Sequence, residues 1–176
     1  MLRDRKTLLI LFGLPVVQIL IFGFALTNEV KNSKILLVDH ARDIASQNII
    51  TKIEASRYFE IQESALSLSR IEDAFREGKI KMAIVIPANF QYDLMHENRA
   101  SIQVIVHASD PNTANTLTQY VSSIIRDYQA EQNELMGIPL RITPEIKMLY
   151  NPQLKGAPNF VPGVMALVLM LISVTM

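Results

Sequence analysis

The chain of 176 residues contains no cysteine, no tryptophan and no excess of charge of either sign. Without cysteine it forms no disulfide framework and no thiolate metal site, so any folded domain depends on its hydrophobic core for stability. Its 17 basic and 17 acidic residues give a net charge of zero. Proteins that bind nucleic acid need a basic face to displace phosphate counterions. We therefore expect no nucleic acid among its partners.

Sequence patterns that carry common enzyme chemistry are also missing. There is no GxxxxGK[ST] phosphate-binding loop, no GxSxG nucleophile elbow and no HExxH zinc pattern. The histidines His40, His96 and His107 stand far apart, without the spacing of metal ligands. Asp39, His40 and Asp43 resemble an acid–base group, but such residues directly after a strand are more often turn residues. We predict that the chain is not an enzyme and has no catalytic, cofactor or metal site.

Two stretches without charge lie at the ends of the sequence. Residues 8–26 and 160–176 hold 28 apolar residues in 36 positions. A helix of 19 residues is about 28 Å long, close to the hydrocarbon thickness of a bilayer, whereas 17 residues reach only about 25 Å. We predict one complete transmembrane helix at 8–26 and the start of a second at 160–176, in a chain that is truncated. A cleaved signal peptide is the alternative for 8–26, although its apolar region is usually shorter.

Basic residues at the start of the chain predict its orientation in the membrane. Arg3, Arg5 and Lys6 precede the first predicted span, and basic flanks tend to remain in the cytoplasm. Residues 1–7 are therefore predicted to be cytoplasmic and residues 28–159 extracytoplasmic. The alternative role of the three basic residues is to dock a cytoplasmic partner.

Two residues inside the first predicted span are candidates for packing or for the transport path. Gln18 carries an amide that needs a partner in the bilayer, so it is expected to face another helix or a substrate pathway. Pro15 is expected to kink the helix, with neighbouring helices satisfying the carbonyl that it leaves without a donor.

Between the two stretches, strand and helix patterns alternate. Strand patterns cover residues 35–39, 58–61, 80–86, 102–106 and 142–150, and helix patterns cover residues 42–56, 69–78, 89–97 and 110–137. The last helix has an apolar stripe that predicts a core face: Leu117, Tyr120, Val121, Ile124, Ile125 and Tyr128. The alternation predicts an α/β or α+β domain with a mixed, partly parallel sheet. Since both of its ends join predicted spans, they should lie close together on the membrane-facing side.

Four sequence motifs resemble one bacterial family. The segment EGKIKMAIVIPANF at residues 77–90 is similar to the G-K-x-x-x-A-I-V-I-P-x-x-F stretch of ABC exporter permeases of the type-2 class. VHASDPNTA at residues 106–114 resembles the family's D-G-S-D-P-N-T-A stretch, with His107 and Ala108 in place of its usual Asp-Gly. YNP at 150–152, followed by FVPG at 160–163, resembles the entry into the second transmembrane helix. LVD at 37–39 also fits.

This resemblance implies a function and partners that the residue patterns alone do not supply. It implies the N-terminal part of a six-helix, multi-pass permease of the bacterial inner membrane, which exports drugs or other amphiphilic compounds. A separate ATP-binding ABC subunit would hydrolyse ATP, and a second permease copy would complete a homo- or heterodimer. A periplasmic adaptor protein is a further expected partner, besides the lipid bilayer.

A two-span membrane sensor with an extracytoplasmic sensing domain is the alternative function. Its layout of two spans around about 130 outer residues is the same as the one predicted here. The sequence that follows position 176 distinguishes the two, because a permease continues with four more spans and a sensor with a signalling domain.

Overall fold

The computed structural model describes residues 30–64 and 69–155, together with single positions at 16, 161, 165, 166 and 169. Among these residues, no helix combines the length and the apolar character needed to cross a membrane. The spans predicted at 8–26 and 160–176 fall almost wholly outside the described residues. They therefore stay predictions.

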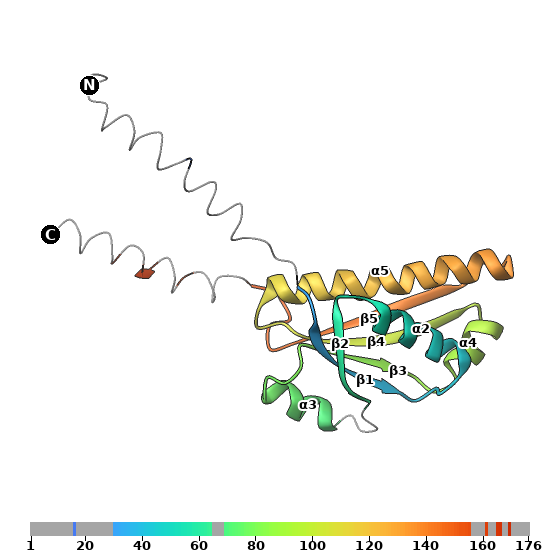
Figure 1. Ribbon diagram of the computed structural model, residues 1–176, viewed down its shortest axis with the longest axis horizontal. Coiled ribbons are helices and arrows are strands. Elements are labelled where there is room, and N and C mark those ends of the chain that lie inside the picture. Colours follow the sequence, from blue (N-terminus) through green and yellow to red (C-terminus); the bar gives the residue numbers. More distant parts are fainter. Residues whose placement is uncertain are drawn as a thin grey trace, which may run out of the picture.

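The described residues form an α/β domain whose elements follow the predicted order (Figure 1). The strands are β1 (Ser33–Asp39), β2 (Phe59–Ser64), β3 (Met82–Ile86), β4 (Arg99–His107) and β5 (Arg141–Leu149). The helices are α2 (Ile44–Ala55), α3 (Ser69–Arg76), α4 (Phe90–His96) and α5 (Pro111–Met136). Each predicted strand and helix is present, with boundaries that differ by a few residues.

The strands form a single mixed sheet in the order β2-β1-β3-β4-β5. Strand β1 is parallel to both β2 and β3, β4 is antiparallel to β3, and β5 is parallel to β4. Helices α2, α4 and α5 cover one face of the sheet, and α3 lies on the other (Figure 1). The prediction of a mixed, partly parallel sheet is confirmed.

The main core lies between the sheet and the three helices on its better-covered face. Helix α5 contributes Leu117, Val121, Ile125 and Tyr128, each at most 2% exposed. The stripe predicted on this helix is therefore a core face, with Tyr120 and Ile124 packed at its margin. Asp110 and Gly137 cap the two ends of the helix, as the sequence predicts.

A smaller core lies under α3 on the opposite face. Ile71 and Phe75 of α3 pack on the side chains that β1 and β3 turn to this side, such as Val38 and Val85. Strand β3 is consequently buried on both faces along its whole length. Helix α3 has only eight residues, so within residues 30–64 and 69–155 no helix covers much of β4 and β5 on this side.

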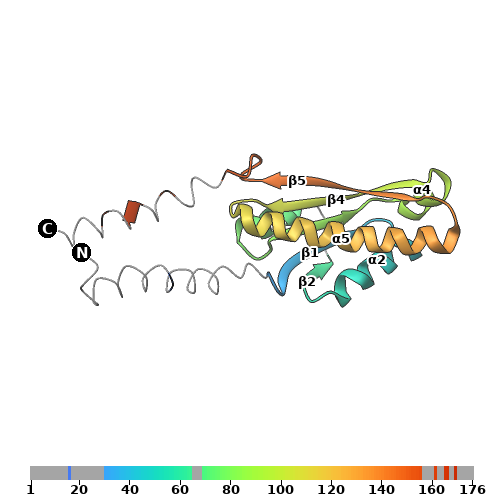
Figure 2. The ribbon, with the colours of Figure 1, turned by 90° about the horizontal axis from the view of Figure 1, so that it is seen from above.

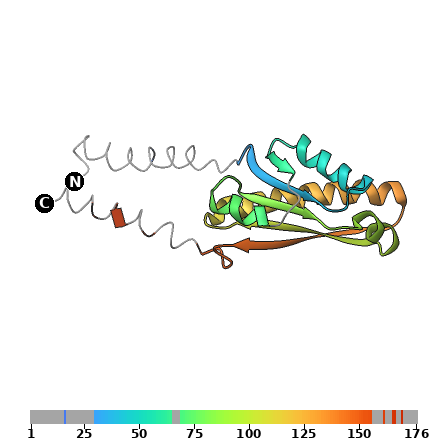
Figure 3. The ribbon, with the colours of Figure 1, turned by 90° about the horizontal axis from the view of Figure 1, so that it is seen from below.

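Both ends of the described domain lie at the same end of the sheet. The strand register aligns Ile35 with Met82, Met82 with Val106, and Val106 with Met148, so β1 begins where β5 ends. Figures 2 and 3 show β5 running along the sheet edge toward that end. We call it the near end and the opposite end the far end. Three strand spacings, about 14 Å, separate β1 from β5, which agrees with the expected proximity of the two ends.

Candidate functional site

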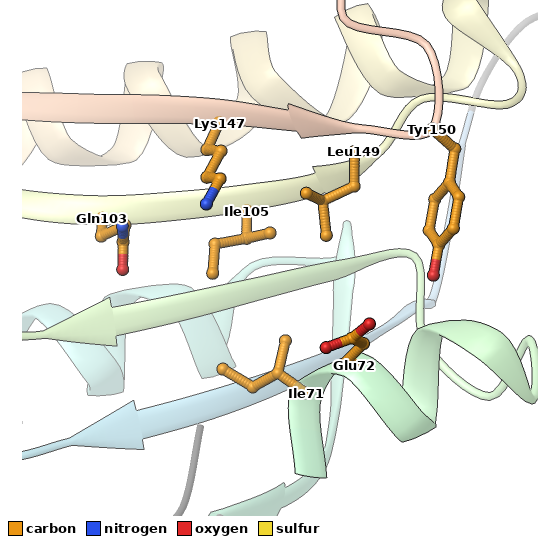
Figure 4. Close-up of a pocket in the computed structure, with 7 residues that line it drawn as sticks. All are labelled: Ile71, Glu72, Gln103, Ile105, Lys147, Leu149 and Tyr150. Atoms are coloured by element: carbon orange, nitrogen blue, oxygen red, sulfur yellow. The ribbon is translucent and has the colours of Figure 1, made fainter. Parts of the chain in front are cut away.

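A groove of about 460 Å³ opens on the α3 side of the sheet (Figure 4). Its walls are α3 on one side and β4 with β5 on the other. The residues that line it are Ile71, Glu72, Gln103, Ile105, Lys147, Leu149 and Tyr150. We call this site the α3 groove.

The groove results from strand alternation beside a short helix. Side chains alternate between the two faces of a strand, and β4 turns Gln103 and Ile105 toward α3 while β5 turns Lys147 and Leu149 to the same side. The parallel register places Ile105 beside Lys147. Because α3 packs over β1 and β3, the described residues leave the space above this part of β4 and β5 open.

The two charged side chains of the α3 groove differ in their partners. The Glu72 carboxylate of α3 lies 3.6 Å from the Arg76 guanidinium, one helical turn further along, and both side chains of this ion pair are exposed. The Lys147 side chain forms no hydrogen bond or ion pair with any described residue. Figure 4 shows its ammonium group turned into the groove from β5, while the Glu72 carboxylate enters from the opposite wall. An exposed pair such as Glu72–Arg76 is weak. Among the described residues that line the groove, Lys147 is the basic one.

Three rings in tilted contact lie at the near end of the α3 groove. The His107 imidazole is 5.8 Å from the Phe75 ring and 4.6 Å from the Tyr150 ring, measured between centroids. Burial lowers the pKa of His107, and the nearby Lys81 charge lowers it further. The imidazole is therefore neutral at pH 7 and packs as an aromatic ring.

The acid–base group considered at Asp39, His40 and Asp43 is a turn and helix cap at the far end. The Asp39 carboxylate accepts hydrogen bonds from the Arg42 backbone N–H at 3.1 Å and the Ser46 hydroxyl at 2.9 Å. Asp43 caps α2 by accepting from the Ser46 N–H at 2.7 Å, and it also accepts from the Gln91 N–H at 2.8 Å. These bonds hold the turn after β1, which confirms the turn interpretation.

The three histidines lie apart. His40 follows β1 and His96 ends α4, both at the far end, whereas His107 ends β4 at the near end. Within the described ranges, no three residues of the kinds that bind metals come together.

The other predicted site residues fall outside the described residues. These are the orientation signals Arg3, Arg5 and Lys6, and the span residues Pro15 and Gln18. Their roles stay predictions.

Residues of the family-like motifs build turns, caps and core. Gly78 takes a positive φ of 69° and ends α3, a conformation that glycine adopts without strain. Phe90 is fully buried. Asp110 accepts from the Asn112 and Thr113 N–H groups at the start of α5.

The departure from the family pattern has a local structural setting. Ala108 is fully buried, and its N–H donates to the Leu149 carbonyl. His107, where the family usually has an aspartate, packs between two aromatic rings.

Sequence reasoning did not identify the α3 groove. The polar residues that the strands contribute, Gln103 and Lys147, occupy single positions within otherwise ordinary strands and belong to no motif. The signal available was a lysine at a strand position between apolar neighbours, but only the β4–β5 register shows that it lies beside Ile105.

Comparisons with known proteins give a consistent result. A family model described as "ABC-2 family transporter protein" matches residues 5–176. Two Escherichia coli K12 proteins, each named a probable multidrug ABC transporter permease, are similar to the chain. YbhS is 28% identical over 176 residues, or 97% of this chain, and YbhR is 26% identical over 168 residues, or 96%. The chain spans 46% of the length of each.

Among solved structures, the chain is similar to a crystallised domain assigned to an ABC type-2 transporter from Thermotoga maritima. The TM-score is 0.49 at 18% sequence identity, and the match covers 65% of this chain and 86% of that one.

Proposed function

The chain belongs to the ABC-2 family of transporter proteins, and from this premise we propose that it is part of the membrane-spanning permease of an ATP-driven exporter. The observation that carries the proposal is the family match over residues 5–176, which includes both charge-free stretches and the whole domain between them. The same match favours the permease over the two-span sensor. The names of the two E. coli relatives support efflux of drugs or other amphiphilic compounds.

Under this proposal, the described domain lies outside the cytoplasm and the charge-free stretches cross the inner membrane. The basic residues before position 8 support a cytoplasmic N-terminus. The domain geometry is compatible, because both of its described ends lie at the near end of the sheet. The near end would then face the membrane and the far end would point away from it.

Thiol labelling in intact cells tests this topology. The chain has no cysteine, so an introduced thiol is the chain's single reactive site. Leu135 in the last turn of α5 is 79% exposed, and Leu135→Cys should react with a membrane-impermeant maleimide before lysis. Thr7→Cys is the control and should react after lysis alone. The opposite pattern would place the domain in the cytoplasm.

Three protein partners follow from the proposal. An ATP-binding subunit supplies ATP hydrolysis, because the chain lacks a phosphate-binding loop, and a second permease copy completes the transport unit. The third partner is an adaptor protein.

The adaptor protein would bind at the far end of the domain. Three large apolar side chains are exposed there: Ile44 at 72%, Tyr92 at 59% and Met95 at 46%. Exposed apolar side chains gathered on one surface are typical of protein-binding sites.

The transport role itself is tested by ATP-dependent movement of an amphiphile across the membrane, with the partner subunit present. Hydrolysis of ATP by the purified chain alone would contradict the proposal that a separate subunit hydrolyses ATP.

A further inference from the structure

We propose that the α3 groove is a binding site for an anionic amphiphile, with the acidic group at Lys147 and the apolar part along the groove. The inference rests on the proposed transport function in one respect: the compound that binds in the groove is taken to be the compound that is transported. Binding is therefore measured separately from transport in the experiment below.

The size and lining of the α3 groove suit a small amphiphile. Its volume of about 460 Å³ falls within the range of roughly 300–1,000 Å³ that is common for small-molecule sites. Ile71 lines the α3 wall and Ile105 the β4 wall, and Leu149 and the Tyr150 ring extend the apolar surface toward the near end (Figure 4). Such a lining, interrupted by a few polar groups, is typical of sites that hold an apolar body in one orientation.

The position of Lys147 in the groove is the feature that favours an anionic head group. Lys147 is directed into the groove and has no partner among the described residues, and Gln103 beside it offers amide hydrogens. The opposing carboxylate, Glu72, already faces the Arg76 guanidinium. An acidic group at Lys147 therefore gains a partner without displacing an existing ion pair.

The position of the groove connects this site to the proposed transport path. Leu149 and Tyr150 lie at the near end, from which the chain leaves the domain toward the second charge-free stretch. With the near end facing the membrane, a compound that leaves the bilayer reaches this part of the domain first.

Photo-crosslinking with a matched pair of probes tests the proposal. Both probes have the same twelve-carbon chain with a diazirine, and they end in a carboxylate or in a trimethylammonium group. The 176-residue chain is held in discs of phosphatidylcholine, and labelled peptides are quantified by mass spectrometry. We expect the carboxylate probe to label residues 71–76, 103–107 and 147–150 about two- to fivefold more than its cationic twin, the range that corresponds to one exposed ion pair.

Three variants separate the groove from general effects of charge and fold. Lys147→Glu should reverse the preference between the probes. Arg141→Glu is the matched control, because it makes the same charge change on the same face of β5, about 20 Å away, and should leave the preference intact. Leu149→Ser should reduce labelling by both probes. Unchanged thermal unfolding of each variant shows that its fold is retained.

Equal labelling of the groove by both probes, or a preference that survives Lys147→Glu, would overturn the proposal. Phosphatidylglycerol is itself an anionic amphiphile, so loss of carboxylate labelling when it is included in the discs would support the anionic site and identify a lipid as its occupant.

Discussion

At the scale of single residues, His107 departs from the family pattern, and its pKa affects the pH dependence of stability. Its ring lies between Phe75 and Tyr150, which join α3 and the end of β5 to β4. Burial and the Lys81 charge lower its pKa below the ordinary value of 6.5. A lowered histidine pKa means that the folded state binds a proton less readily than the unfolded chain does.

The sign of the resulting pH dependence follows directly. As pH falls below 6.5, the unfolded chain takes up a proton at this position before the folded chain does. The folded state therefore loses stability until the pH falls below the lowered pKa that His107 has in the folded state. Asp110, whose pKa is lowered mainly by the Thr113 hydroxyl, loses its contribution at more acidic pH. Among the described groups with a shifted pKa, the interval between pH 8 and pH 5.5 therefore concerns mainly His107.

We predict that His107→Phe reduces the fall in thermal unfolding temperature between pH 8 and pH 5.5. Phenylalanine keeps a ring between Phe75 and Tyr150 but does not titrate. Comparison at pH 8, where the imidazole is neutral in both states, separates the packing effect of the substitution from its effect on titration. An identical pH-dependent fall in the variant and the original chain would show that His107 does not contribute.

At the scale of elements, α5 was the most predictable part of the fold. A capping aspartate, a proline at the first helical position, an apolar stripe and a closing glycine all specify the same helix, and the structure has it at Pro111–Met136. Strand β3 was found from the apolar alternation at Ile80, Met82, Ile84 and Ile86. That it is buried on both faces depends on α3 packing across it, which local sequence does not specify.

We predict that Ile125→Ala costs about 2–4 kcal/mol of unfolding free energy. Ile125 is 1% exposed in the main core, so its truncation removes buried methyl groups and leaves a cavity. Chemical denaturation of a fragment spanning residues 30–157, expected to unfold cooperatively, measures the change. Arg126→Ala, at the adjacent exposed position, is the control and should stay within about 0.5 kcal/mol of the original. A similar small change at Ile125 would mean that the stripe is not a core face.

At the scale of the whole molecule, the sequence predicted the class of the domain but not the order of its strands. The alternation of strands and helices indicates that some strands are parallel. It does not indicate that β4 pairs antiparallel with β3 while β5 returns parallel to β4. The α3 groove could not be predicted for the same reason, since its walls come from residues 71–72, 103–105 and 147–150.

The most direct test of the permease assignment uses inside-out vesicles from cells that express the complete gene of this chain with its ATP-binding partner. Uptake of a fluorescent amphiphile is followed after addition of ATP, and a partner subunit with a substituted phosphate-loop lysine serves as the control. We expect ATP-dependent uptake that requires both proteins and an intact phosphate-binding loop in the partner. Equal uptake when this chain is left out, with the ATP-binding subunit active, would contradict it.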